Sequence, residues 1–208
     1  MGMAGADLGN QIGNQAPPPP VWRRLFHLTA GSVIPVAGIF AAELGMIIAL
    51  AALTAGAFAL DLARFRLEWL NQQFLRWLAP LLKADESRRI TGATYMVLAA
   101  LVVFVFFHPA VAVTALLFLS LGDPAAAIVG IRMPGPRVFG KSPGGTVAFV
   151  AAAWGVVGIL VATGVVEYHW GLMAGGVVAG LAELAPLPLD DNLTVPLSAG
   201  LAMHFFGV

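Results

Sequence analysis

An aspartate followed by a proline interrupts a long apolar stretch in the middle of the chain. Asp123 and Pro124 lie inside an apolar run from Pro109 to Ile131. Proline has no N–H to donate, so Pro124 predicts a break in the helix at this point. A broken helix exposes backbone groups beside a carboxylate, a common way to bind an ion or a phosphate. Asp123 is therefore a candidate catalytic and metal-binding residue, with an ordinary helix cap as the alternative.

A glycine-rich segment with one lysine precedes the next apolar run. Glycines let the backbone approach a polyphosphate, and amides at a helix N-terminus bind anions. The stretch from Gly135 to Ser142 also satisfies the P-loop pattern G-x-x-x-x-G-K-S/T. A P-loop follows a strand of a parallel sheet, for which this chain has no room. We expect a nucleotide-phosphate loop without the P-loop fold, or else a flexible turn; its residues are Gly140, Lys141, Ser142, Gly144, Gly145 and Thr146.

A third polar cluster lies near the C-terminus. Glu183 interrupts an apolar run, and Asp190, Asp191 and Asn192 follow between two apolar segments. Mg²⁺ favours one or two carboxylates together with water and substrate phosphates. The sequence therefore predicts a Mg²⁺ site at Glu183, Asp190 and Asp191, with Asn192 beside the nucleotide. The alternative is a solvated turn in which an aspartate caps the last helix.

A fourth cluster is basic. Arg23, Arg24 and His27 open the first apolar run, and Arg88 and Arg89 precede the third. Arg24 or Arg89 is a candidate for steadying transferred charge, and charges that only set the membrane topology are the alternative. The other histidines, His108, His169 and His204, are expected to be structural, because no two histidines have metal-ligand spacing.

The composition decides the class of protein that must hold these clusters. Of 208 residues, 59% are apolar and only 11% are charged, and the net charge is zero. A soluble domain carries about 25% charged residues. These values exclude a disordered chain, a nucleic-acid binder and an ordinary soluble enzyme, and they indicate an integral membrane protein. The chain has no cysteine, so disulfides and thiolate chemistry are excluded as well.

The apolar runs predict an all-α, polytopic helix bundle with about seven transmembrane helices. Several runs are near or below the 17 residues that a span needs, so tilted or broken helices are expected. Residues 1–20, polar and ending in four prolines, read as a disordered tail before a single catalytic domain at 21–208. The predicted spans are 25–41, 44–60, 91–107, 109–122, 145–165, 170–187 and 193–207.

The charges predict how the bundle is oriented. Residues 61–82 combine apolar residues at helical spacing with Trp69 and Trp77, which predicts an amphipathic helix at the membrane interface that ends near Pro80. If seven spans alternate, all 11 basic residues fall on the side of the N-terminus. The positive-inside rule then puts the N-terminus and the candidate site in the cytoplasm, and we expect a prokaryotic inner membrane.

The four clusters, in this order, resemble the membrane-bound CTP-dependent lipid kinases, which include dolichol kinase, phytol kinase and CTP-dependent diacylglycerol kinase. The resemblance implies transfer of the γ-phosphoryl group of CTP to a lipid alcohol, with Mg²⁺ or another divalent cation. It implies that Lys141 and the glycine loop hold the phosphates. It also implies that Asp123, Asp190 and Asp191 hold the metal, or that one of them accepts the hydroxyl proton. The matching blocks are Arg23-Arg24-x-x-His27, Gly122-Asp123-Pro124-x-Ala126, Gly140-Lys141-Ser142-x-x-Gly145-Thr146, and Glu183 with Asp190-Asp191-Asn192-x-x-x-Pro196.

Two other functions remain as alternatives. One is a cytidylyltransferase of the CDP-diacylglycerol synthase type, although that family's Lys-Asp pair, His-Gly-Gly segment and closing Asp-Arg-x-Asp are absent here. The other is a non-enzymatic membrane transporter or scaffold that uses the same acids for ions. Among lipid acceptors, phytol, a longer polyprenol or dolichol, and diacylglycerol all stay open, with a simple isoprenoid alcohol favoured. The sequence specifies no oligomeric state.

Overall fold

The computed structural model describes residues 21–78 and 89–208, with side chains described from Leu28 onward. The predicted tail at 1–20, the helix end near Pro80, and the basic residues Lys83 and Arg88 lie outside the described residues. The described part contains eight helices, which confirms the all-α prediction. They are α1 (Val21–Phe40), α2 (Glu43–Arg66), α3 (Glu68–Leu78), α4 (Gly92–Phe106), α5 (Pro109–Arg132), α6 (Pro143–Ala162), α7 (Trp170–Leu184) and α8 (Asp191–Phe205).

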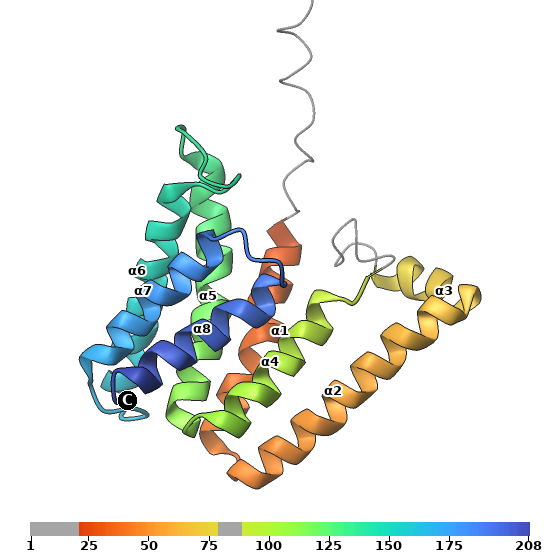
Figure 1. Ribbon diagram of the computed structural model, residues 1–208, viewed down its shortest axis with the longest axis horizontal. Coiled ribbons are helices and arrows are strands. Elements are labelled where there is room, and N and C mark those ends of the chain that lie inside the picture. Colours follow the sequence, from red (N-terminus) through yellow and green to blue (C-terminus); the bar gives the residue numbers. More distant parts are fainter. Residues whose placement is uncertain (1–20, 79–88) are drawn as a thin grey trace, which may run out of the picture.

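Helix α5 is the centre of the bundle. It contacts α1, α4, α6, α7 and α8, and its side chains between Val111 and Ser120 are all buried. Helix α2 packs mainly on α4 and lies at the edge of the bundle (Figure 1). Within the described residues the only β pairing is an isolated bridge between Val138 and Lys141, so no sheet of the P-loop kind is present there.

The helices alternate in direction, so their ends gather at two opposite ends of the bundle (Figure 1). At one end α2 and α7 finish, and α4, α6 and α8 begin. We call this the basic end, because it carries all the described Lys and Arg residues from Leu28 onward. The chain ends at the opposite end (Figure 1). The basic residues are Arg64, Arg66, Arg76, Arg89, Arg132, Arg137 and Lys141.

Three of the described helices are long and apolar enough to cross a membrane, namely α2, α5 and α6. Shorter apolar helical segments lie at Leu28–Phe40, Gly92–Phe106 and Trp170–Leu184. Many large apolar side chains of α2 face outward, including Leu44, Ile48 and Leu53. An apolar outer surface of this kind suits lipid rather than water. The prediction that the chain crosses the membrane seven times, and the predicted orientation of these spans, are not tested by the structure.

The prediction of a helix break at Pro124 was wrong. Helix α5 continues through Pro124 to Arg132, so the predicted span 109–122 is ten residues too short. An internal proline removes one backbone hydrogen bond. In α5 the packing on five neighbouring helices outweighs that loss, and Pro124 itself is buried. Asp123 therefore projects from an unbroken helix instead of marking a helix end.

The boundary of the amphipathic segment also differs from the prediction. Helix α2 does not stop at residue 60 but continues to Arg66, and it takes in Asp61 and Arg64. The chain turns at Leu67, whose backbone is extended, and α3 begins at Glu68. Leu67 and Trp69 are exposed, and α3 has no buried residue. The described part of the predicted segment, residues 61–78, thus belongs to two helices, of which only α3 is the amphipathic one.

Candidate active site

Lys141 joins two acidic side chains from different helices at the basic end. Its ammonium Nζ lies 3.1 Å from Oε1 of Glu183 and 2.9 Å from Oδ2 of Asp191. The same ammonium group donates a hydrogen bond to the backbone carbonyl of Glu183. We call Lys141, Glu183 and Asp191 the Lys141 cluster. It brings together two of the polar segments that the sequence analysis singled out, from the loop after α5, the end of α7 and the start of α8.

A tight turn presents Lys141 toward these acids. The backbone N–H groups of Val138 and Lys141 each donate to the other residue's carbonyl, at 2.9 Å. The two residues between them, Phe139 and Gly140, both have positive φ, of 51° and 82°. A two-residue turn of this kind favours glycine at such a position, because a side chain there is strained. The backbone conformation of the turn therefore explains the glycine at position 140, whether or not a ligand binds there.

Helix α6 begins directly after Lys141 and packs closely on α5. Pro143 is its first residue, where a missing N–H costs nothing, and Ser142 caps the helix without a side-chain hydrogen bond. A Cβ added to Gly145 would lie 2.8 Å from the carbonyl oxygen of Ala126, so α5 and α6 touch here. One turn in, Oγ1 of Thr146 is buried and has no hydrogen-bond partner in the described structure.

The two adjacent aspartates at the start of α8, Asp190 and Asp191, have different roles. The Asp190 carboxylate caps the helix, because Oδ1 accepts from the backbone N–H of Asn192 at 3.0 Å. Asp191 lies in the first turn and pairs with Lys141. Asn192 is buried beside them. The helix-cap interpretation thus applies to Asp190, whereas Asp191 belongs to the Lys141 cluster.

Asp123 lies near this cluster from the side of α5. Its charge acts on the carboxylate of Glu183, as does that of Asp191. The structure therefore places Asp123, Lys141, Glu183 and Asp191 at one end of the bundle. The backbone of Arg24 belongs to α1, but its side chain lies outside the described side chains. Arg89 is exposed, and its carbonyl accepts a hydrogen bond from Arg64.

The environment of Lys141 keeps it positively charged. Burial by itself lowers the pKa of Lys141, but the hydrogen bond that its ammonium donates to Asp191 and the charges of Asp191 and Glu183 raise it by more. The net result is a pKa above the ordinary value of 10.5. An ammonium that stays charged at neutral pH and is partly shielded from water attracts a phosphate strongly.

The acids suit a magnesium ion that arrives together with a nucleotide. No group of three or more His, Cys, Asp or Glu side chains that could hold a metal ion occurs among residues 21–78 and 89–208. Mg²⁺ needs only one or two carboxylates when phosphates and water complete its shell. Asp123, Glu183 and Asp191 supply hard carboxylate oxygens of this type. The donor set therefore fits Mg²⁺ bound to substrate phosphates, and a protein-only metal site does not follow.

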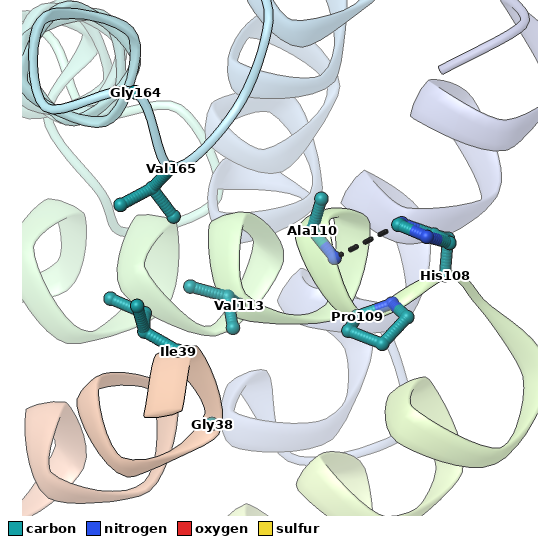
Figure 2. Close-up of a pocket in the computed structure, with 8 residues that line it drawn as sticks. All are labelled: Gly38, Ile39, His108, Pro109, Ala110, Val113, Gly164 and Val165. Carbon is teal, nitrogen blue, oxygen red and sulfur yellow. Dashed lines mark hydrogen bonds between the residues drawn. The ribbon is translucent and has the colours of Figure 1, made fainter. Parts of the chain in front are cut away.

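A pocket and two helix-capping histidines lie away from this site. The opposite end of the bundle holds a pocket of about 400 Å³ lined by the end of α1, the start of α5 and the loop after α6. Figure 2 shows that His108 faces this pocket and accepts from the N–H of Ala110, at 3.4 Å. His169 caps α7 in the same way, at 3.1 Å from Gly171. Both histidines thus have the structural role that the sequence predicts.

The sequence reasoning missed a second charged cluster. Asp61 and Arg64 are almost fully buried in the last turns of α2, where Arg64 Nε donates to Asp61 Oδ1 at 2.7 Å. The signal was present in the sequence, because an acid and a base three residues apart after a long apolar run would meet on one helix face. It was overlooked because α2 was expected to stop at residue 60.

The comparisons with known proteins give two distant relatives. One is an uncharacterised protein of Rickettsia prowazekii, 23% identical over 196 residues, which cover 88% of this chain and 93% of the relative. The other is CTP-dependent diacylglycerol kinase 1 of Schizosaccharomyces pombe, 26% identical over 163 residues, which cover 71% of this chain and 75% of the relative. No family model matches the sequence, and no solved structure matches it.

Proposed function

We propose that this protein is a lipid kinase that transfers the γ-phosphoryl group of CTP to the hydroxyl of a membrane lipid. The observation that carries the proposal is the Lys141 cluster, a lysine held by two carboxylates from separate helices at the basic end of an apolar bundle. The similarity to a CTP-dependent diacylglycerol kinase supports it from a separate direction. Phosphoryl transfer needs mainly positioning and charge neutralisation, which charged side chains on a rigid bundle provide.

In this mechanism Lys141 leaves its carboxylates and binds the terminal phosphates of CTP. The N–H groups in the first turn of α6 and the Thr146 hydroxyl, which has no partner among the described residues, donate to phosphate oxygens. The glycine at position 145 keeps this helix end against α5. We assign Gly144 and Asn192 to the nucleotide as well. One or two of the carboxylates of Asp123, Glu183 and Asp191 would hold a magnesium ion, which when bound supplies positive charge to the phosphates, whereas Asp190, which the sequence also predicts as a ligand, caps α8.

The lipid hydroxyl oxygen then attacks the γ-phosphorus. The new bond joins that oxygen to phosphorus, and the bond between the γ-phosphorus and the bridging oxygen breaks, so CDP leaves with the electron pair. The hydroxyl proton passes to a carboxylate, for which Asp123 and Asp191 are the two candidates. Arg24 steadies the charge of the transferred group. The products are a lipid phosphate and CDP.

The acceptor is best identified with the purified protein in lipid vesicles. Phytol, a long-chain polyprenol and diacylglycerol are offered separately with CTP and Mg²⁺, and lipid products are detected by mass spectrometry. We expect one acceptor class to gain a phosphate with CTP and much less with ATP. If no lipid alcohol gains a phosphate under any of these conditions, the proposed function is wrong.

A further inference from the structure

Asp61 and Arg64 form a buried, fully connected cluster at the junction of α2 and α4. Both oxygens of Asp61 are used: Oδ1 accepts from Arg64 Nε at 2.7 Å, and Oδ2 accepts from the Thr94 hydroxyl at 2.7 Å. The backbone N–H of Thr91 also donates to Oδ2, at 3.0 Å. Thr91 in turn caps α4. We call Asp61, Arg64, Thr91 and Thr94 the Asp61–Arg64 cluster.

Arg64 extends this cluster to α3. Its Nη1 donates to the side-chain oxygen of Asn71 at 3.3 Å, and its Nη2 donates to the backbone carbonyl of Arg89. The guanidinium plane also lies over the rings of Phe65 and Phe74, at 4.6 and 4.7 Å from the ring centroids. One side chain with an exposed fraction of 1% thus touches α2, α3 and the segment before α4.

Among the described residues, helix α3 packs mainly on α2, and none of its own residues is buried. In Figure 1 it lies at the end of α2, apart from the helices around α5. Trp69 and Trp77 are 64% and 76% exposed, which is unusual for such large apolar side chains. Within the described residues, the contacts of Arg64 with Asn71 and Phe74 tie α3 to the end of α2.

The position of α3 in the chain indicates what covers its tryptophans. Helix α2 is apolar and long enough to span a membrane, and α3 begins two residues after α2 ends. A helix that directly follows a span lies at the level where the chain leaves the lipid. Tryptophan prefers this headgroup level, where its ring is partly in lipid and its N–H is in water. The occupant that fits the exposed face of α3 is a lipid surface.

We propose that the Asp61–Arg64 cluster is a positioning site that holds α3 on the membrane surface. Through Thr91 the same cluster fixes the start of α4, and α4 packs on α8, which carries Asp191 in its first turn. The depth of α3 in the headgroups therefore sets the height at which a lipid hydroxyl meets the Lys141 cluster. This last step rests on the proposed function.

Only arginine satisfies all partners at once. Its planar guanidinium directs Nε to Asp61, Nη1 to Asn71 and Nη2 to the Arg89 carbonyl, and its flat face stacks on aromatic rings. A lysine at this position keeps the charge, but it has a single nitrogen and no planar face. Arg64→Lys is therefore expected to loosen α3 without leaving Asp61 unpaired. Arg66→Lys is the matched control, because Arg66 is exposed on the same helix turn.

The first arm of the test measures the mobility of α3 and needs no enzymatic activity. The chain has no cysteine, so Gln73→Cys on the exposed side of α3 gives a single site for a nitroxide label. In anionic lipid vesicles we expect a slowly tumbling, lipid-accessible label, and a clearly faster one when Arg64→Lys is added. Arg66→Lys should leave the spectrum unchanged. A label that is accessible only to water, or one that Arg64→Lys does not change, overturns the proposal.

The second arm measures kinetics with a lipid acceptor. Arg64→Lys should raise KM for the lipid about tenfold and leave KM for CTP unchanged, whereas a general loss of structure would change both. Asn71→Ala removes the contact on the side of α3 alone, so it replaces Arg64→Lys if that variant does not fold. Equal changes in the two KM values contradict the proposal. If the wild-type protein has no kinase activity, the proposed function is wrong. The nitroxide-label measurement still tests how α3 is held, because it does not depend on activity.

Discussion

At the scale of single residues, the charge balance of the Lys141 cluster matters most. Without nucleotide the ammonium is bound by Glu183 and Asp191, whose side chains are 10% and 35% exposed. Removing the lysine would leave the buried Glu183 carboxylate without its partner, which is costly in a region of low dielectric. A phosphate that takes Lys141 releases both carboxylates, and a divalent cation then restores the balance. We therefore expect the nucleotide and the metal ion to bind together, and neither of them to bind well alone.

The first prediction concerns Lys141 itself. Lys141→Met keeps the length of the side chain but removes its charge, so CTP-dependent phosphorylation should fall by about 10²–10³-fold or more. Arg137→Met is the control, because Arg137 is exposed in the same loop, and it should keep nearly full activity. Both variants are assayed in the same vesicles as the wild type. Full activity of Lys141→Met would remove the lysine from the mechanism.

The second prediction follows from the raised pKa of Lys141. A cationic group whose pKa is raised on folding stabilises the folded state below its unfolded pKa, and this contribution disappears as the pH rises through the folded pKa. Wild type should therefore melt above Lys141→Met by a constant margin from neutral pH to about pH 10, and the margin should shrink at higher pH. Thermal unfolding in detergent measures it. A margin that already shrinks near neutral pH would mean that the lysine is not held by the two acids.

At the scale of elements, close packing of α5 and α6 places the loop that carries Lys141. Gly145 lies against Ala126, and the ring of Phe149 fills the space beside Gly122. Gly145, which the sequence analysis assigned to phosphate binding, thus also has a packing reason. Small residues at helix contacts of this kind let two backbones approach closely in lipid. The position of Lys141 depends on this approach, because α6 starts two residues later.

A third prediction tests this packing with two glycines of the same helix. Gly145→Ala would place a Cβ 2.8 Å from the Ala126 carbonyl oxygen, so it should destabilise the protein by about 1–3 kcal/mol. At Gly158 an added Cβ meets open space, so Gly158→Ala should be neutral or stabilise by up to about 1 kcal/mol. Chemical denaturation of both variants checks the difference. Equal stabilities would mean that α5 and α6 are not in contact at Gly145.

The elements also show what the sequence could and could not predict. The helices and the ends where Lys141, Glu183 and Asp191 lie follow from hydropathy and charge, because a bilayer restricts which segments can span it. The pairing of Lys141 with Asp191, 50 residues away, depends on which helices pack together. The break at Pro124 was predicted wrongly because the local loss of one hydrogen bond was weighed without the burial of α5. The buried pair of Asp61 and Arg64 was missed for a similar reason, because its burial depends on the packing of α2, α3 and α4.

At the scale of the whole molecule, the distribution of charge predicts an orientation in the membrane. The described basic side chains lie at one end of the bundle, and Glu167 lies in the loop at the other. Positively charged loops stay on the cytoplasmic side of a membrane. We therefore predict that the basic end, with the Lys141 cluster, faces the cytoplasm.

The fourth prediction tests this orientation with single cysteines in a chain that has none. Arg137→Cys lies at the basic end, and Tyr168→Cys replaces a side chain that is 65% exposed at the opposite end. A maleimide that does not cross membranes should label Tyr168→Cys in intact spheroplasts and Arg137→Cys only after the membrane is opened. The reverse pattern would place the Lys141 cluster outside the cell.

The central claim is that the γ-phosphoryl group of CTP moves to a lipid hydroxyl, and isotope position tests it most directly. The purified protein in vesicles with a lipid alcohol is given CTP labelled either on the γ-phosphate or on the α-phosphate, and the extracted lipid is counted. The account predicts label in the lipid from γ-labelled CTP and none from α-labelled CTP. Label from the α-phosphate would indicate a cytidylyltransferase, and no label from either would indicate a transporter or scaffold; both results contradict the account.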